Sequence, residues 1–423
     1  MMSELEYLIK NGGLTPKQLL AKITRRGFSA SVLSGLAGAA APRLSGASPG
    51  ADFTIAIIPD PQYLATSCPD DNGHYYSAMM QWVLDNRNIV LKSGRASFAA
   101  NVKAVVGVGD CVNSATGNEF ANAQAAWTIL DKNGIAFTTP PGNHDYAGGP
   151  SSRNNLGAQF STGFFSPKVR SRIYRSGMSL GDGDTAYWIG SFDSTGANTA
   201  VKFVISGTRL LFLAMDFFAG NAPWSWAYNV MLANPDCECY ITTHAWLTTN
   251  GLQYQRGDGY GPNAYSMAAA PYSNSAAEAW SNAGVKTWSN LCGVFSGHDL
   301  ISSRNTDPAG TASPAWFWQR VAVRSESARR QEVQQLFVNS QELDQRCDMS
   351  VSRATGAGQV ASVFLLTRRL QLGLLEGRMI STRSGNWFGS RSPSFPEGTS
   401  WSTLETLLFS IPFAPSGQNV ATR

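Results

Sequence analysis

The chain has 423 residues, of which 43% are hydrophobic and 15% are charged. That length and composition can bury a substantial core, and they exclude a disordered or fibrous protein. The formal net charge is only +4. Because the sequence also lacks a block of Lys or Arg, nothing in it supports a general electrostatic attraction to nucleic acid.

The first recognisable segment is a basic N-terminal stretch. Thr24-Arg25-Arg26-Gly27-Phe28-Ser29 precedes a weakly apolar run rich in Ala and Gly, and Ser45-Gly46-Ala47 offers a small-residue cleavage site. This pattern resembles a bacterial twin-arginine export signal, with a basic amphipathic helix as the alternative. We therefore expect residues 1–47 to be an export signal read by the twin-arginine translocase. The mature chain, residues 48–423, is expected to be periplasmic or secreted.

The mature chain is expected to be electrically balanced. The signal holds six of the 33 basic and two of the 29 acidic residues, which leaves 27 of each sign. No later stretch approaches roughly 18 continuous apolar residues, so we expect no membrane span in the mature chain. An oxidising compartment permits disulfides, but the sequence leaves their pairing open among Cys68, Cys111, Cys237, Cys239, Cys292 and Cys347.

Strand and helix patterns alternate through the first part of the mature chain. We predict a strand over 53–59, a helix rich in apolar residues between Met79 and Ile89, a strand over 103–109 and a helix carrying Trp127. This alternation favours an α/β sheet. Residues 151–198 are rich in Gly, Ser and Asn and are predicted to form a long irregular insert that lines or covers a site.

The second part is predicted to be richer in strands. Paired strands near 201–206 and 209–215 precede a helix with Trp224 and Trp226, and two further strands are expected to end at His244 and His298. An antiparallel meander over 330–383, completing a second sheet, is predicted from apolar runs at 333–338, 360–367, 370–375 and 378–382.

Residues of the metal-binding type follow five apolar runs of the sequence. The five ends carry, in chain order, Asp60 with Gln62, Asp110, Asn143 with His144 and Asp145, His244, and His298. In open α/β sheets, ligands collect beyond the carboxyl ends of the strands, so we expect the five ends to converge. Three of the four histidines in the chain fall in these positions. The pattern therefore predicts one shared metal site.

Taken in order, Asp-x-Gln, Gly-Asp, Gly-Asn-His-Asp, a strand-end His and a final Gly-His resemble the motifs of the calcineurin-like metallophosphoesterases. The resemblance covers about residues 52–300, and Asp60-Pro-Gln62 resembles a branch in which Gln replaces the usual His. It implies an α/β fold with four layers, α-β-β-α, in which two mixed sheets lie face to face with helices outside. The phosphoesterase domain would be residues 48–423, with its core at 52–300.

The resemblance also implies a role for each motif residue. One or two ions of Mn, Fe or Zn would be held by Asp60, Gln62, Asp110, Asn143, His244 and His298. Asp110 would bridge the two ions. His144 would donate to the developing oxyanion or to the leaving group, and Asp145 would hold its ring. A water activated by the metal would be the nucleophile.

These roles imply an exported hydrolase of phosphate monoesters or diesters, acting on a small molecule or an exposed phosphorylated substrate. Two departures from the family pattern motivate an alternative. Gln62 replaces an imidazole, and Leu300 stands where the final Gly-His-x-His motif has its second His. The alternative is a binding protein that keeps the fold and a single metal site without turnover. A glycan-binding module that uses the aromatic loops is a third possibility.

Two sets of residues in the inserts are candidates for substrate contacts. Spare phosphate oxygens would suit Arg153, Arg170, Arg172, Arg175 and Arg256, although exposed arginines also serve simply as solvated surface. A ring or sugar next to the phosphate would suit the aromatic residues, which would equally pack the inserts: Tyr146, Phe164, Phe165, Tyr254, Tyr260, Tyr265 and Tyr272.

Overall fold

The computed structural model describes a mixed α/β unit. It covers residues 51–58, 60–65, 74–93, 96–174, 176–248, 252–288, 290–298, 316–323, 331–339, 360–370, 374–383 and 405–412, all within one compact unit, residues 50–423. The expected export signal lies outside the described residues, as do Cys68, Cys347, Arg175, Asp299 and Leu300. The four described cysteines, Cys111, Cys237, Cys239 and Cys292, are free thiols.

Six of the described strands form the first sheet, in the order β16-β15-β14-β1-β4-β5. Their bounds are β1 Phe53–Ile58, β4 Val102–Gly107, β5 Ala136–Thr138, β14 Val360–Arg369, β15 Leu374–Arg383 and β16 Glu405–Pro412. The three strands β1, β4 and β5 are parallel, whereas β14 joins β1 in the antiparallel sense. The carboxyl ends of β1, β4 and β5 therefore lie at the same edge.

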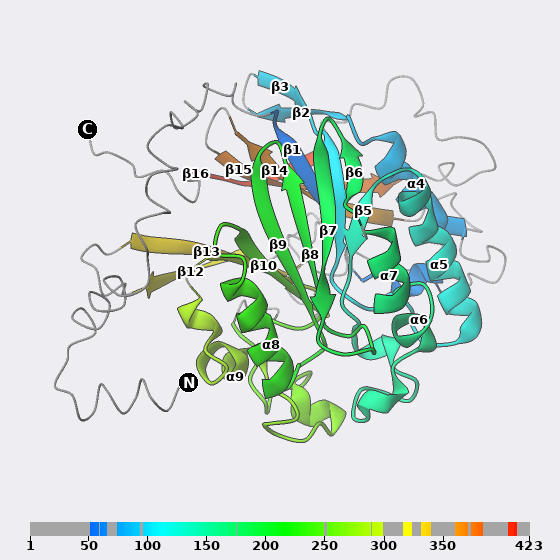
Figure 1. Ribbon diagram of the computed structural model, residues 1–423, viewed down its shortest axis with the longest axis vertical. Helices are drawn as coiled ribbons and strands as arrows, with labels where there is room; N and C mark the ends of the chain where they lie inside the picture. The colour runs from blue at the N-terminus through cyan, green and yellow to red at the C-terminus, as the bar shows by residue number, and fades with distance from the viewer. Residues whose placement is uncertain are drawn as a thin grey trace, which may run out of the picture. The chain divides into compact units, whose positions relative to one another are not determined.

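Eight described strands form the second sheet, in the order β12-β13-β11-β10-β9-β8-β7-β6. Their bounds are β6 Met178–Gly181, β7 Asp184–Ser191, β8 Thr199–Ile205, β9 Thr208–Met215, β10 Glu238–Thr243, β11 Leu291–Ser296, β12 Trp316–Val323 and β13 Gln331–Asn339. The strands β7, β8 and β9 run side by side as long green arrows (Figure 1). The four strands β9, β10, β11 and β13 are parallel.

Alternating side chains of the central strands build the core on both faces of each sheet. Phe53 and Ile55 of β1 point into a cluster that also holds Phe203 and Phe212 of the second sheet. The alternate residues Ala56 and Ile58 face the opposite way, into a second cluster. Burial on both faces explains why these strands read as continuous apolar runs rather than as alternating ones.

Helices pack against both sheets. The helices α4 (His74–Asp85) and α5 (Gly117–Lys132) lie side by side (Figure 1) and pack on the first sheet. Trp127 Nε1 of α5 donates to the hydroxyl of Tyr76 in α4 at 2.7 Å. The helices α8 (Asn221–Leu232) and α9 (Ala276–Ser281) pack on the second sheet. No described helix is long and apolar enough to cross a membrane.

Two expectations about the fold need correction. Residues 151–198 are not irregular throughout, because they contain α6 (Ala158–Ser161), α7 (Pro167–Ile173), β6 and β7. The predicted meander is also divided between the two sheets. β13 lies beside β11 in the second sheet, whereas β14 and β15 belong to the first.

The short elements are α3 Gln62–Ala65, the pair β2 Val90–Ser93 and β3 Ala96–Ala99, and the 3-10 turns η1 Asn143–Asp145, η2 Arg153–Asn155, η3 Pro262–Tyr265 and η4 Val285–Thr287.

Candidate metal centre

Four of the five predicted strand ends meet through direct contacts. Asp60 follows β1 and Asp110 follows β4 in the first sheet, while His244 follows β10 and His298 follows β11 in the second. Asp60 Oδ2 accepts the backbone N–H of His298 at 2.8 Å. The backbone N–H of Gly297 donates to the His244 carbonyl at 2.9 Å. The carboxyl ends of the two sheets therefore come together here, as the sequence predicted.

The imidazole of His244 lies between the two carboxylates. Its Nε2 is 3.0 Å from Asp110 Oδ2, and its Nδ1 is 3.5 Å from Asp60 Oδ1. His298 Nδ1 lies 3.2 Å from the same Nε2. Asp60, Asp110 and His244 are each at most 2% exposed. Two acids and two imidazoles thus share a small, water-poor volume.

Two of these residues adopt backbone conformations that residues other than glycine rarely take. Asp110 has φ 49° and His298 has φ 78°. Non-glycine residues in this left-handed region cost on the order of 1–3 kcal/mol and gather at functional sites. The strain in both residues is consistent with a site that is held in place for its chemistry rather than for stability alone.

Two glycines permit the close approach of the acids. A Cβ at Gly142 would lie 2.1 Å from Asp110 Oδ1, and a Cβ at Gly297 would lie 2.0 Å from Asp60 Oδ1. Both separations are far below van der Waals contact. Any larger residue at either position would push a carboxylate out of the site.

Gly297→Ala should therefore disturb the centre itself. We expect Asp60 to be displaced, the metal content to fall, and unfolding to become easier by about 1–3 kcal/mol, the usual cost of overpacking. Gly190→Ala is the matched control, because no atom lies within 4 Å of its added Cβ. Metal analysis and urea unfolding of both variants test this, and an unchanged metal content in Gly297→Ala would contradict the close approach.

The charges in the centre are strongly coupled. Burial raises the pKa of the Asp60 carboxyl to about 7, against the opposing effect of His244. Burial alone would lower the pKa of His244, but Asp110 and Asp60 raise it to about 9. For Asp110, burial opposes ionisation, yet the charge of His244 holds its pKa below the usual value. The carboxylate of Asp110 and the imidazole of His244 therefore favour each other's charged forms.

The hydrogen bonds of the two imidazoles direct one nitrogen of each toward the same point. His244 Nδ1 lies 3.0 Å from the Val108 carbonyl, which can only accept, so this nitrogen carries a hydrogen. His298 Nε2 lies 3.3 Å from the Tyr260 carbonyl and carries a hydrogen for the same reason. Nε2 of His244 then faces both Asp110 Oδ2 and Nδ1 of His298. Backbone carbonyls orient metal-binding imidazoles in this way.

This donor set fits a divalent or trivalent cation. Carboxylate oxygens and neutral imidazole nitrogens together suit Mn, Fe or Zn. Asp60 Oδ1 and Asn143 Oδ1 are buried without a hydrogen-bond partner among the described residues. In the described part of the chain no three His, Cys, Asp or Glu side chains stand at metal-binding separation.

The two predicted amide ligands lie beside this cluster. Asn143 opens η1 and is buried, and its neighbours approach Asp110 directly: the backbone N–H of His144 donates to Asp110 Oδ1 at 2.9 Å. Gln62 opens α3, two residues after Asp60, and is 3% exposed. Both are buried next to residues of the centre.

His144 and Asp145 differ from the expected arrangement. The ring of His144 is not held by Asp145, because its Nδ1 lies 2.6 Å from the carbonyl oxygen of Asn113. The Asp145 carboxylate instead accepts three backbone N–H groups, from Gly142 at 2.7 Å, Val112 at 3.1 Å and Cys111 at 3.2 Å. Asp145 thus fastens the loop after β4 to the loop after β5. It organises the site without contacting the ring.

Sequence reasoning missed the groups that orient the imidazoles. The carbonyls of Val108 and Asn113 are backbone atoms, which every residue carries, so no side-chain signal marks them. The aromatic side chain of Phe217 was missed too, and its ring centroid lies 5.7 Å from that of His244 and 5.1 Å from that of His298. Phe217 follows the end of β9, so the strand-end rule that gave the candidate ligands also points to it.

Three of the candidate arginines are held in ion pairs. Asp131 holds Arg170 at 2.6 Å, Asp216 holds Arg153 at 2.8 Å, and Glu278 holds Arg256 at 2.8 Å. Arg170 is also 4% exposed, so solvated surface is the wrong description for it. Arg172 lies exposed on α7.

Comparison with known proteins gives a distant likeness. No known protein-family profile matches the chain. Over 208 residues the chain is 25% identical to an uncharacterized protein, YvnB, from Bacillus subtilis (strain 168). The matched segment is 49% of this chain and 14% of that protein, so the chain spans about a seventh of the length of this curated relative.

Proposed function

We propose that this protein is an exported, metal-dependent hydrolase of phosphate mono- or diesters with the calcineurin-like metallophosphoesterase fold. The observation that carries the proposal is the meeting of Asp60, Asp110, His244 and His298, from four strand ends in two sheets, with two of them in strained backbone conformations. Helices packed outside each of two facing sheets support the four-layer arrangement. The export signal and a periplasmic or secreted location belong to the same proposal.

Six residues are the proposed metal ligands. Asp60, Gln62, Asp110, Asn143, His244 and His298 would hold one or two ions of Mn, Fe or Zn. When bound, such ions stabilise charge on phosphoryl oxygens and lower the pKa of water. Asp60, Asp110 and His244 are each at most 2% exposed, so bulk water has little access to them.

His144 is the proposed proton donor. The Asn113 carbonyl fixes the hydrogen on Nδ1 of its ring, which leaves Nε2 to exchange a proton with the leaving oxygen. The ring is partly exposed, unlike the buried ring of His244, so a substrate can reach it. Asp145 acts only through the backbone of the two loops.

His144→Ala is the experiment that tests this function. We expect hydrolysis of 4-nitrophenyl phosphate or bis(4-nitrophenyl) phosphate to fall about 10²–10⁴-fold, the usual contribution of a positioned acid or base. The metal content should stay at the wild-type value, because the side chain of His144 is not among the proposed ligands. Steady-state kinetics beside metal analysis of the full chain give both quantities.

The same measurements distinguish a hydrolase from the alternative, a binding protein without turnover. A wild-type chain that retains metal but hydrolyses neither ester after manganese, iron or zinc is added would overturn the enzymatic proposal. Asn113→Ala is the matched control, because it removes a neighbouring side chain and leaves intact the carbonyl that holds the His144 ring. Its rate should stay close to that of the wild type.

A further inference from the structure

Four aromatic rings surround His298. Phe217 comes from the end of β9, and Tyr254, Tyr260 and Tyr265 come from residues 252–275, here called the tyrosine loop. Their ring centroids lie 5.1, 5.7, 5.9 and 5.7 Å from the imidazole, in that order. The hydroxyl of Tyr265 is also 3.2 Å from His298 Nε2. The tyrosine loop is therefore one wall of the candidate metal centre.

The exposure of these rings increases outward from the centre. Tyr254 is 1% exposed and belongs to the core, Tyr265 is half-buried, and Tyr260 is 59% exposed. The Tyr260 ring stands at 85° to the imidazole of His298. A large aromatic surface is thus open to solvent directly beside a proposed metal ligand. Packing of the insert accounts for Tyr254 but leaves this open surface of Tyr260 unexplained.

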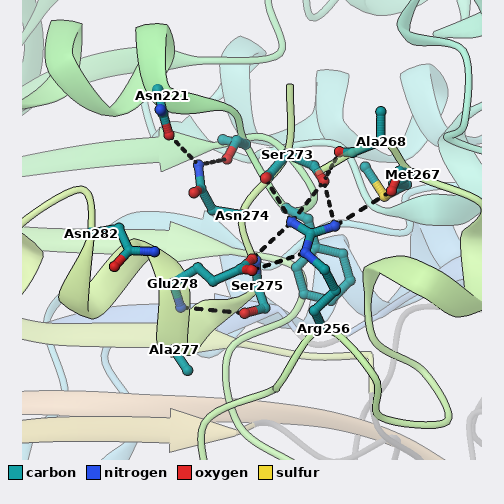
Figure 2. A network of polar contacts seen from close by, with 12 residues as sticks. Asn221, Arg256, Met267, Ala268, Ser273, Asn274, Ser275, Ala277, Glu278 and Asn282 are labelled. Carbon is teal, nitrogen blue, oxygen red and sulfur yellow. Dashed lines mark hydrogen bonds and ion pairs between the residues drawn. The ribbon is translucent and has the colours of Figure 1, made fainter. Parts of the chain in front are cut away.

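Arg256, near the start of the tyrosine loop, fastens it to the end of the loop and to α9, as Figure 2 shows. The guanidinium donates to both carboxylate oxygens of Glu278, at 2.9 and 2.8 Å, and to the Ser273 carbonyl at 2.7 Å. Glu278 also accepts the backbone N–H of Ser275, at 2.7 Å, at the start of α9. The loop is thereby tied to the first turn of a helix that packs in the core.

A second tie holds the far end of the tyrosine loop. Asn274 donates to the Ala219 carbonyl at 3.1 Å and to the side chain of Asn221 at 3.0 Å, and the Asn221 contact is drawn in Figure 2. The backbone N–H of Asn221 donates in turn to the Pro271 carbonyl at 2.9 Å. A loop held at both places presents its rings without a large ordering cost, which favours binding.

The positive charge of Arg256 in the tyrosine loop is neutralised by Glu278. Because Glu278 holds Arg256, this arginine is not available to pair with a phosphate oxygen. The loop therefore offers a substrate aromatic surface rather than a positive charge. A planar ring stacked on an aromatic side chain gains on the order of 1–3 kcal/mol per ring in nucleic-acid complexes.

We propose that Tyr260, supported by Tyr265, is a specificity-determining residue that stacks on a planar ring of the substrate. The substrate class is a phosphate ester whose ester group carries an aryl ring or a nucleobase. This inference rests on the proposed function, because it requires the phosphoryl group to sit at the candidate metal centre. Arg256 is a positioning residue, since it holds the loop and touches no substrate.

The test compares two ligands that differ only in the ring. Phenylphosphonate and methylphosphonate carry the same phosphonate group and resist hydrolysis, so calorimetric titration of the manganese-loaded full chain reports binding without turnover. We expect phenylphosphonate to bind more tightly to the wild type. Tyr260→Ala should reduce that preference about five-fold or more, the equivalent of about 1 kcal/mol. Tyr260→Phe should keep it.

The controls separate the two proposals. Tyr187→Ala removes an exposed tyrosine of β7, 38% exposed, and should leave the preference unchanged. An equal affinity of the wild type for both phosphonates, or a preference that survives Tyr260→Ala, would overturn the aromatic subsite and leave the hydrolase proposal standing. If neither phosphonate binds, phosphoryl recognition itself fails, and both proposals fall. An unchanged affinity for methylphosphonate shows that each variant is folded.

Discussion

Replacing Asp110 with Asn is expected to remove most of the bound metal and with it the hydrolytic activity. Asp110 faces His244 Nε2 at 3.0 Å and accepts the backbone N–H of His144 at 2.9 Å. An Asn keeps the shape of the side chain and the bond from His144 but removes the negative charge. Changes to outer partners of metal ligands alone weaken affinity by about 10–100-fold, so the loss of a proposed bridging ligand should exceed that range.

The measurement is metal content per chain after dialysis against a weak chelator, followed by competition titration for affinity. Asp184→Asn is the matched control, because Asp184 is also a buried carboxylate, paired with Lys103 at 3.0 Å in another part of the fold. It should retain wild-type metal content. Metal affinity of Asp110→Asn equal to that of the wild type would show that Asp110 is not a ligand, whatever happens to the rate.

The residues that meet at this centre could be predicted because they obey a local rule. Each follows an apolar run, and parallel strands bring their carboxyl ends to one edge. The rule needs no knowledge of side-chain contacts, and it placed Asp60, Asp110, His244 and His298 correctly relative to their strands. The same rule placed His144 next to the centre.

The contacts within the centre could not be predicted in the same way. The partner of the His144 ring is a backbone carbonyl at Asn113, and the Asp145 carboxylate turns to three backbone N–H groups. Such choices depend on how two loops of different strands fold against each other, and the sequence carries no spacing for them. The family pattern suggested that Asp145 holds the ring of His144. In the structure the Asn113 carbonyl holds that ring instead.

The division of the predicted meander also depended on long-range pairing. An apolar run with β propensity predicts a strand but not its neighbour. β13 pairs with β11, and β14 pairs with β1 across more than 300 residues of sequence. Both the run at 333–338 and the run at 360–367 became strands, as predicted. Their assignment to different sheets follows from packing on partners far away in the chain.

A buried ion pair joins these two sheets, and removing only one of its charges should be strongly destabilising. Arg368 of β14 and Glu238 of β10 are each 3% exposed, and the guanidinium contacts both carboxylate oxygens, with Nη2 2.7 Å from Oε1. Arg368→Met should leave the Glu238 carboxylate buried without its cation. We expect this to lower the free energy of unfolding by about 3–5 kcal/mol, measured by urea unfolding of the full chain.

Two comparisons distinguish this loss from a general effect of removing arginine. Arg209→Ala breaks an exposed pair with Asp236, whose side chains are 54% and 52% exposed, and should cost at most about 1 kcal/mol. The double variant Glu238→Leu with Arg368→Met replaces both charges by apolar groups and should recover most of the stability. A loss in Arg368→Met no larger than that in Arg209→Ala would mean that the Glu238 carboxylate is not left as an uncompensated charge. If the expected losses hold, Arg368 neutralises a carboxylate that is buried between β14 and β10. β14 in turn pairs with β1, the strand that carries Asp60 into the centre.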